Sequence, residues 1–228
     1  MKSHGEVYFF VFIALNIIAS YAAFVRAPIE VTMGDVYRIF YIHTPAAWVC
    51  YLALAVSLFA SIIFLARRKP KYDKVAEASA ILGLLYGLVA IVTGAIWSNV
   101  VWGAYWNWDP RQTTTLILWM AYLGYVSLKF SIGHLEKRAL IGAVYNVLAF
   151  STIPLSYLSI RLWQSLHPQI ITPSEISITA PMIETLFLNL IAASLIYLYF
   201  LRMMVTVRSL EERVEALVSA RGGATLGT

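Results

Sequence analysis

The run AAWVCYLALAVSLFASIIFLA, residues 46–66, carries no charged side chain and is followed at once by the basic block RRKPK. A helix needs roughly 20 apolar residues to cross a bilayer, where every backbone polar group must be satisfied within the segment. The whole chain of 228 residues is 60% hydrophobic, and its mean hydropathy is +0.73. Soluble domains are roughly 45–50% apolar. The sequence therefore predicts an all-α, polytopic membrane protein.

The same criterion, applied along the chain, predicts six transmembrane helices separated by short polar connections. They cover Val7–Val25, Ala46–Ala66, Ala78–Val101, Thr113–Ser131, Leu140–Ile160 and Met182–Met204. The first run is long for the apolar part of a signal peptide and no clean cleavage site follows it, so we expect it to stay. Residues 1–208 are treated as one transmembrane domain. Residues 209–228 are expected to form a cytoplasmic tail that begins as a surface helix and ends partly disordered.

The basic residues predict the orientation of these helices. One side collects 13 of the 17 Lys and Arg residues, and the other carries only Arg26, Arg38, Arg111 and Arg161. Cytoplasmic connections of membrane proteins are enriched in Lys and Arg, so both termini are expected in the cytoplasm. The outer connections are then residues 26–45, 98–112 and 161–181. The net charge of +5 thus reports membrane orientation, and no nucleic-acid partner is expected.

Tryptophans are concentrated on the predicted outer side. They are Trp48, Trp97, Trp102, Trp106, Trp108, Trp119 and Trp163. An aromatic belt that only anchors a protein in lipid populates both interfaces, although it can account for single residues such as Trp48. The stretch VWGAYWNWDPRQTT, residues 101–114, places three tryptophans between two spans. Large flat faces in one connection favour an aromatic platform for a planar apolar ligand.

The histidines narrow the ligand class. His4 and His134 fall on the predicted inner side, whereas His43 and His167 fall on the outer side, each close to a proline that restrains the backbone. Haem combines a flat apolar ring, an iron that takes axial imidazoles, and two propionates that suit arginine. His43 and His167 are therefore the predicted iron ligands.

Arginines on the same side are the predicted propionate partners. Arg38 and Arg111 are the first choices, and Arg161 is a weaker one. Asp109 has the wrong sign for a propionate. It could orient Arg111 or cap the helix that begins at Pro110, and the sequence leaves both roles open.

At these residues the chain resembles a known family. WGAYWNWDPRQT, residues 102–113, resembles the tryptophan-rich WWD signature of the haem-handling proteins of cytochrome c maturation, approximately W-G-x-x-W-x-W-D-x-R-L-T. The matching residues are Trp102, Gly103, Trp106, Trp108, Asp109, Arg111 and Thr113. GDVYRIFYIHTPAAW and RLWQSLH are similar to the segments around the two outer histidines of the CcmC branch, whose six-span length also fits. Gln112 and Tyr105 depart from the signature but remove no ligand or charge.

The resemblance implies a function and a set of partners. Members of this branch are viewed as binding haem b at the outer, periplasmic face of the plasma (inner) membrane and presenting it to the haem chaperone CcmE. The ABC transporter subunits CcmA and CcmB and the small adaptor CcmD are the implied further partners, with membrane lipid around the helices. The chain has no ATP-binding P-loop, and its single cysteine, Cys50, favours no thiol chemistry. A haem-transfer module is expected rather than an enzyme.

Two other function classes remain open. The first is a permease subunit of an ABC-type exporter that moves haem or another small amphipathic solute. It would need polar residues deep in the spans, where the sequence offers few. The second is a haem-dependent redox enzyme, for which no second metal motif or quinone pocket is evident in the sequence.

Overall fold

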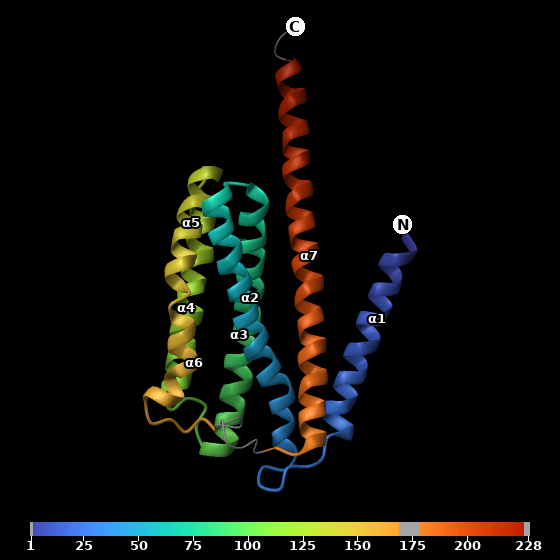
Figure 1. Cartoon of the computed structure of the whole chain (residues 1–228), viewed down its shortest axis with the longest axis vertical. Helices are drawn as coiled ribbons and strands as arrows, with labels where there is room; N and C mark the ends of the chain where they lie inside the picture. Colours follow the sequence, from blue (N-terminus) through green and yellow to red (C-terminus); the bar gives the residue numbers. More distant parts are fainter. Residues whose placement is uncertain (1, 169–177, 226–228) are drawn as a thin grey trace.

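The computed structural model describes residues 2–168 and 178–225, with side chains described from Phe9 to Val218 within those ranges. Its helices run roughly along one axis (Figure 1). They are α1 (Lys2–Tyr21), η1 (Ala22–Arg26), η2 (Asp35–Ile39), α2 (Phe40–Arg67), α3 (Pro70–Trp102), α4 (Pro110–Ser131), α5 (Leu135–Ala149), α6 (Thr152–Leu162) and α7 (Ala180–Thr225). We call the end at which α3 leads into α4 the outer end, and the opposite end the inner end.

The expectation of a polytopic helical membrane protein is confirmed. Five helical stretches are long and apolar enough to cross a membrane: Phe9–Arg26, Asp35–Arg67, Pro70–Trp102, Leu135–Leu162 and Ala180–Val218. The remaining predicted span, α4, has 22 residues and falls outside this set because threonines, tyrosines and Lys129 lower its hydropathy. Figure 1 shows α4 running alongside α5 and α6, and it also packs on α3.

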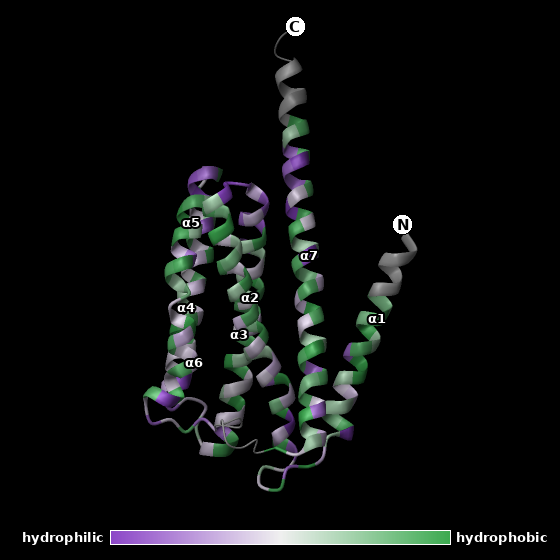
Figure 2. Ribbon diagram, in the orientation of Figure 1, coloured by the Kyte–Doolittle hydropathy of each residue, from purple (hydrophilic) through white to green (hydrophobic). Residues whose placement is uncertain are grey.

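Hydropathy divides the molecule along its axis. In Figure 2, hydrophilic residues gather at the inner ends, around the α2–α3 and α4–α5 connections and on α7 at and beyond that level. α3 starts at Pro70, where a proline costs nothing because the first amide of a helix has no intrahelical acceptor. α7 continues without a break from the apolar part through to Thr225. The predicted boundary at residue 208 therefore falls inside one helix.

The first outer connection is shorter than predicted. The sequence analysis placed His43 and Pro45 in a loop, but both lie in α2, which begins at Phe40 directly after η2. Pro45 lies in the second turn of α2 and has no amide hydrogen for the carbonyl of Tyr41, so α2 lacks this one hydrogen bond. His43 is thus carried by a helix, and not by a loop as expected.

The predicted span Leu140–Ile160 is interrupted. α5 ends at Ala149 and α6 begins at Thr152. Pro154 cannot donate to the carbonyl of Phe150, four residues earlier. That carbonyl instead accepts from the amide of Ile153 at 3.0 Å. Pro154 is therefore preceded, one turn earlier, by a local break between α5 and α6.

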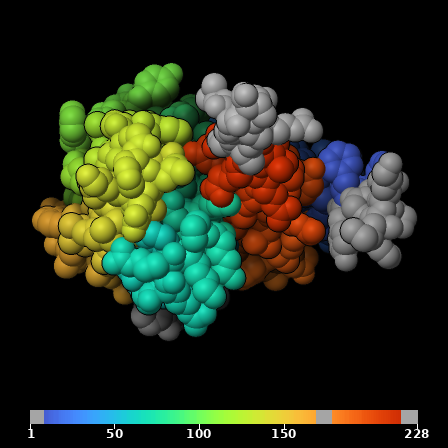
Figure 3. Space-filling view, turned by 90° about the horizontal axis from the view of Figure 1, so that it is seen from above, coloured from blue at the N-terminus to red at the C-terminus, as the bar shows by residue number. Residues whose placement is uncertain are grey.

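Seen from the inner end, α7 lies between two groups of helices (Figure 3). On one side are α2–α5, and on the other is α1, whose main helix contact is α7. At the inner end a buried charge cluster joins α3, α4, α5 and α7. Lys129, 1% exposed, lies 2.5 Å from Asp73 and 3.0 Å from Glu77, and Arg138 and Arg208 also reach Glu77. Because every charge in the cluster has an oppositely charged partner, the cluster can be buried beside apolar helices.

At the outer end the helices diverge. In Figure 1, α2 packs beside α3 at the inner end but leans toward α7 at the outer end, away from α4 and α6. This divergence leaves room between the outer halves of the helices.

Candidate functional site

A cavity of ≈ 240 Å³ occupies this outer half of the bundle. Residues of α2, α3, α4 and α6 and of the segment that follows α6 line it. The lining residues of α2 and α4 belong to the first halves of those helices, and those of α3 to its second half. The cavity is therefore confined to the outer part of the molecule. At its inner edge the hydroxyl of Ser156 lies 3.1 Å from the hydroxyl of Tyr51 and 3.0 Å from that of Thr115.

His43 enters the cavity from α2 and is held against α3. Its Nδ1 lies 3.0 Å from the carbonyl oxygen of Ala90 and 3.1 Å from the hydroxyl of Thr93. A carbonyl oxygen only accepts, so Nδ1 carries the hydrogen in this arrangement and Nε2 keeps its lone pair. Such a bond from the second ring nitrogen is the usual way in which a metal-binding imidazole is oriented.

His167 enters from the segment between α6 and α7. Its Nδ1 lies 3.2 Å from the carbonyl oxygen of Pro168, which again leaves Nε2 as the nitrogen with a lone pair. Burial of the imidazole, followed by the neighbouring guanidinium of Arg111, lowers the pKa of His167 to about 4. The ring is therefore neutral at pH 7, the form that can bind a metal.

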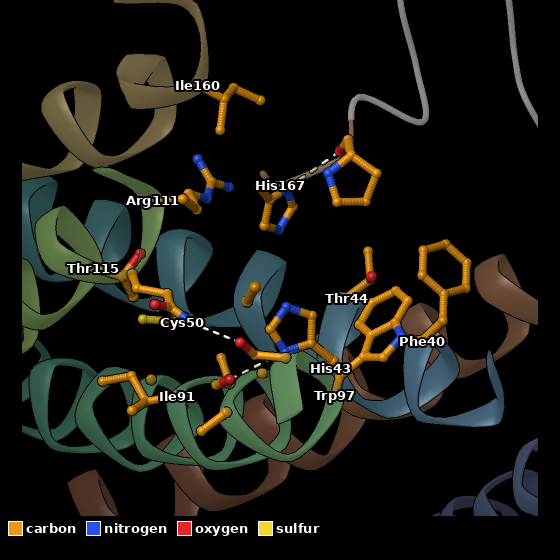
Figure 4. A pocket seen from close by; sticks show the side chains of 18 of the residues that line it. Phe40, His43, Thr44, Cys50, Ile91, Trp97, Arg111, Thr115, Ile160 and His167 are labelled. Carbon is orange, nitrogen blue, oxygen red and sulfur yellow. Dashed lines mark hydrogen bonds between the residues drawn. The ribbon is translucent and has the colours of Figure 1, made fainter. Parts of the chain in front are cut away.

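The two imidazoles face each other across the cavity. Figure 4 shows His43 and His167 on opposite sides of the open space, with Arg111 beside His167 and Trp97 beside His43. The ring centroids of His43 and Trp97 are 5.9 Å apart at 73°. His43 and His167, which are 124 positions apart in the sequence, thus belong to one site, and the cavity between α2 and α6 separates them.

The predicted propionate partners separate into two groups. Arg111 lines the cavity, and its Nη1 donates to the carbonyls of Ser156 at 2.7 Å and Tyr157 at 3.1 Å. Arg161 also lines the cavity. Arg38 does not: its guanidinium is bound to Asp35 at 2.8 Å and to the carbonyl of Ala23 at 2.9 Å. The structure brings together Arg111 and Arg161, and it holds Arg38 in the first outer connection.

The residues that match the tryptophan-rich signature also divide into those that line the cavity and those that do not. Trp102 and Trp106 line the cavity. Gly103 ends α3 with a positive φ of 75°, a conformation that glycine adopts without steric cost. Trp108 is 72% exposed and touches the edge of Trp106, with ring centroids 6.0 Å apart. It therefore lies at the surface beside the site and does not line the cavity.

Asp109 acts as a structural residue, the second of the two roles left open above. It is the N-cap of α4 and accepts the amide of Arg111 at 2.8 Å. It is 6% exposed and does not line the cavity. Its remaining hydrogen bonds run to the segment that carries His167, at Ser165 and Leu166.

Several cavity residues were not singled out by the sequence analysis. Trp48, Trp97 and Trp119 line the cavity from α2, α3 and α4, so five of the seven tryptophans surround one space. Tyr51 and Tyr157 also line it, with ring centroids 6.5 Å apart. The outward bias of the tryptophans was the signal available in the sequence. It could not say which of them share a cavity, because that depends on the rotation of each helix.

Comparisons with known proteins identify the family. The family model described as Heme exporter protein C, CcmC, matches residues 3–220. A cytochrome c biosynthesis ccmC-like mitochondrial protein of Marchantia polymorpha is 34% identical over 178 residues, which cover 76% of this chain and 74% of that protein.

Bacterial relatives give the same result. The heme exporter protein C of Bradyrhizobium diazoefficiens is 33% identical over 141 residues, 62% of this chain and 54% of the relative. That of Escherichia coli K12 is 31% identical over 147 residues, 62% of this chain and 58% of the relative. The match thus spans little more than half the length of these bacterial proteins. Because the family model covers nearly all of the chain, the chain belongs to the heme exporter protein C (CcmC) family of cytochrome c biogenesis.

Proposed function

We propose that this protein binds haem b in the outer cavity and presents it to the haem chaperone CcmE during cytochrome c maturation. The observation that carries the proposal is the pair of imidazoles, His43 and His167, which face each other across a cavity lined by tryptophans. Each ring has its Nδ1 beside a backbone carbonyl and its Nε2 left for a metal. Paired axial imidazoles of this kind are one way in which proteins hold haem iron.

The rest of the cavity suits the ring and its carboxylates. Trp97, Trp102, Trp106 and Trp119 supply flat apolar surfaces. Arg111 has one Nη group bound to α6 carbonyls, so its planar fork is already oriented for a carboxylate. Arg161 is the second arginine that lines the cavity. Arg38 remains a prediction, and it would have to leave Asp35 to reach a ligand.

We further propose six membrane crossings, with α4 as the sixth, and both termini in the cytoplasm. α1 begins and α7 ends toward the inner end of the molecule (Figure 1). The basic connections α2–α3 and α4–α5 lie at that end too. The cavity is then at the periplasmic side of the plasma membrane. Residues 1–208 form the haem-handling domain, with CcmA, CcmB and CcmD as partners inferred from the family.

A permease is the competing function, and the shape of the cavity favours haem presentation instead. A permease moves its solute past the midplane, usually along polar residues. Here the lining residues of α2, α3 and α4 stay in the outer halves of these helices. Below them lies an apolar cluster that includes Leu54, Ala80 and Tyr122. Haem accumulation inside liposomes that contain the protein but no CcmE would favour the permease.

The experiment that tests the proposal is a visible spectrum of the purified protein with haem. The wild type is expected to give the Soret band of six-coordinate, low-spin haem. His43→Ala and His167→Ala are each expected to lose one axial ligand, and the double variant to lose this spectrum altogether. His134→Ala, at the inner α4–α5 connection, is the matched histidine control. A double variant with the wild-type spectrum would show that the ligand assignment is wrong.

A second pair of variants tests the cavity itself. Ile91 lines the cavity, whereas Val92, the next residue on α3, is 49% exposed. Ile91→Trp is expected to fill the cavity and reduce haem binding at least tenfold, while Val92→Trp leaves binding unchanged. Equal effects from both variants would argue against haem binding at this place.

A further inference from the structure

The two histidines are held in different ways. His43 sits on a long helix, packed against α3, with its ring bonded to the carbonyl of Ala90. His167 sits on a connection between helices. Within the described residues, the hydrogen bonds that tie positions 165–167 to another helix all end on one side chain, that of Asp109. These bonds link the segment of the second imidazole to the start of α4 through a single buried carboxylate.

The contacts of Asp109 are specific. Its Oδ1 accepts from the amide of Arg111 at 2.8 Å and from the hydroxyl of Ser165 at 2.9 Å. Its Oδ2 accepts from the amide of Leu166 at 2.7 Å. The amide of His167 in turn donates to Ser165 Oγ at 3.1 Å. The carboxylate thus caps α4 and binds the hydroxyl of Ser165 and the amide of Leu166, and charge makes such bonds stronger than neutral ones.

A carboxylate is required for this combination of contacts. All three donors are N–H or O–H groups, and only an ionised carboxyl group accepts at both oxygens. Asparagine is as good an N-cap as aspartate, so Asp109→Asn preserves the start of α4. With the amide oxygen in the place of Oδ1, which caps α4, the NH₂ group would face the amide of Leu166, and that bond would be lost. The substitution therefore separates the capping role from the tie to the His167 segment.

We propose that Asp109 is a positioning residue that fixes His167 in the cavity through Leu166 and Ser165, and that His167 is consequently the more easily released of the two imidazoles. The proposal rests on the proposed function only where it names His167 as an iron ligand. The hydrogen bonds from Asp109 to Ser165 and Leu166 are a property of the protein without haem. Two measurements therefore test it separately.

The first measurement uses the full-length protein in detergent without haem. The amide of Leu166 is bonded to Asp109 and should exchange slowly with deuterium. In Asp109→Asn, exchange of the peptide that contains residues 163–167 is expected to become about tenfold faster or more, as for the loss of a charged hydrogen bond. Glu184→Gln is the control, because this carboxylate is exposed at the outer end and its one ion pair with a described residue is a 4.0 Å contact with Arg26. Unchanged exchange in Asp109→Asn would overturn the proposal.

The second measurement is the spectrum of the haem-loaded protein. Asp109→Asn is expected to shift the ferric spectrum toward that of His167→Ala, and added imidazole should restore the six-coordinate form in both. Ser165→Ala, which removes one bond of the tie, should give a smaller shift in the same direction. If Asp109→Asn instead resembles His43→Ala and does not respond to imidazole, the proposal is wrong. If His167→Ala itself leaves the spectrum unchanged, the ligand assignment fails. The exchange measurement still decides whether Asp109 holds the segment that carries His167.

Discussion

Gly94 of α3 lies directly against the imidazole of His43. A Cβ atom built on Gly94 would be 2.9 Å from His43 Cε1 and 3.4 Å from Nδ1. Such a contact is too short for two carbon atoms, so a methyl group at this position must displace the ring. The glycine therefore sets where the imidazole lies, although it carries no side chain of its own.

Gly94→Ala is expected to move His43 away from Ala90 and to weaken the six-coordinate haem spectrum, with a loss of haem affinity of about tenfold or more. The measurement is a haem titration followed in the Soret region. Gly133→Ala is the control, since a Cβ there would meet no atom within 4 Å. Equal titration curves for the two variants would contradict the role assigned to Gly94.

Trp108 combines an exposed side chain with unusual backbone geometry. Its φ is 56°, the left-handed region, which costs a residue with a bulky side chain roughly 1–2 kcal/mol. Outliers of this kind persist where the surrounding structure imposes them and are frequent at functional sites. Trp108 lies outside the cavity lining, so its exposed ring is available to another protein.

Trp108→Ala is expected to leave the haem spectrum of the protein unchanged and to slow haem transfer to CcmE severalfold. Transfer can be followed as haem that becomes covalently attached to added CcmE. Trp163→Ala, another half-exposed outer tryptophan, provides the comparison. A changed haem spectrum in Trp108→Ala would place this side chain at the ring instead of at the partner.

Among the helices, α4 shows how a buried polar face lowers the mean hydropathy of a helix. Its inward stripe contains Leu118, Tyr122, Tyr125 and Lys129, each at most 2% exposed. The polar atoms of this stripe reduce the mean hydropathy of α4, but they face other helices and not lipid. Ile117 and Met120, on another face, are exposed. The helix is polar on the side where the bundle covers it.

Lys129→Met is expected to destabilise the protein by about 3 kcal/mol, because it leaves Asp73 and Glu77 facing each other without their central cation. The measurement is denaturant unfolding in micelles. Lys137→Met, an exposed lysine at the same end, should change stability by less than about 0.5 kcal/mol. Adding Asp73→Asn to Lys129→Met should recover part of the loss, and no recovery would argue against a charge effect.

At the scale of the whole molecule, the orientation can be tested on the two sides of α4. Cys50 is the single cysteine and is buried, so Cys50→Ala gives a clean background. Tyr105→Cys lies before α4 and Lys137→Cys after it, both at exposed positions. A membrane-impermeant maleimide is expected to label position 105 in intact cells and position 137 only after lysis. Labelling of both positions from the same side would show that α4 does not cross the membrane.

Much of the fold was predictable because it depends on the hydropathy and charge of successive residues along the chain. Apolar runs of sufficient length predicted the helices. The uneven distribution of Lys and Arg predicts their orientation, which stays a prediction. The boundaries were less accurate. α2 begins six residues before the predicted Ala46, because a proline near a helix start was interpreted as the end of a loop. Beyond the apolar part, α7 continues through SLEERVEALVSA, residues 209–220, where Leu, Glu, Arg and Ala favour a helix although the segment is not apolar.

Composition and residue order predicted a helical membrane protein with two of its histidines and its tryptophans toward one end. Which of these residues share a site was settled by the packing of the helices. It placed His43 against Ala90, brought His167 to face it, and left Trp108 and Arg38 outside the cavity. It also joined Asp109 to residues 56 and 57 positions away. Such contacts depend on the rotation and tilt of packed helices, which periodicity and charge along a single chain do not specify.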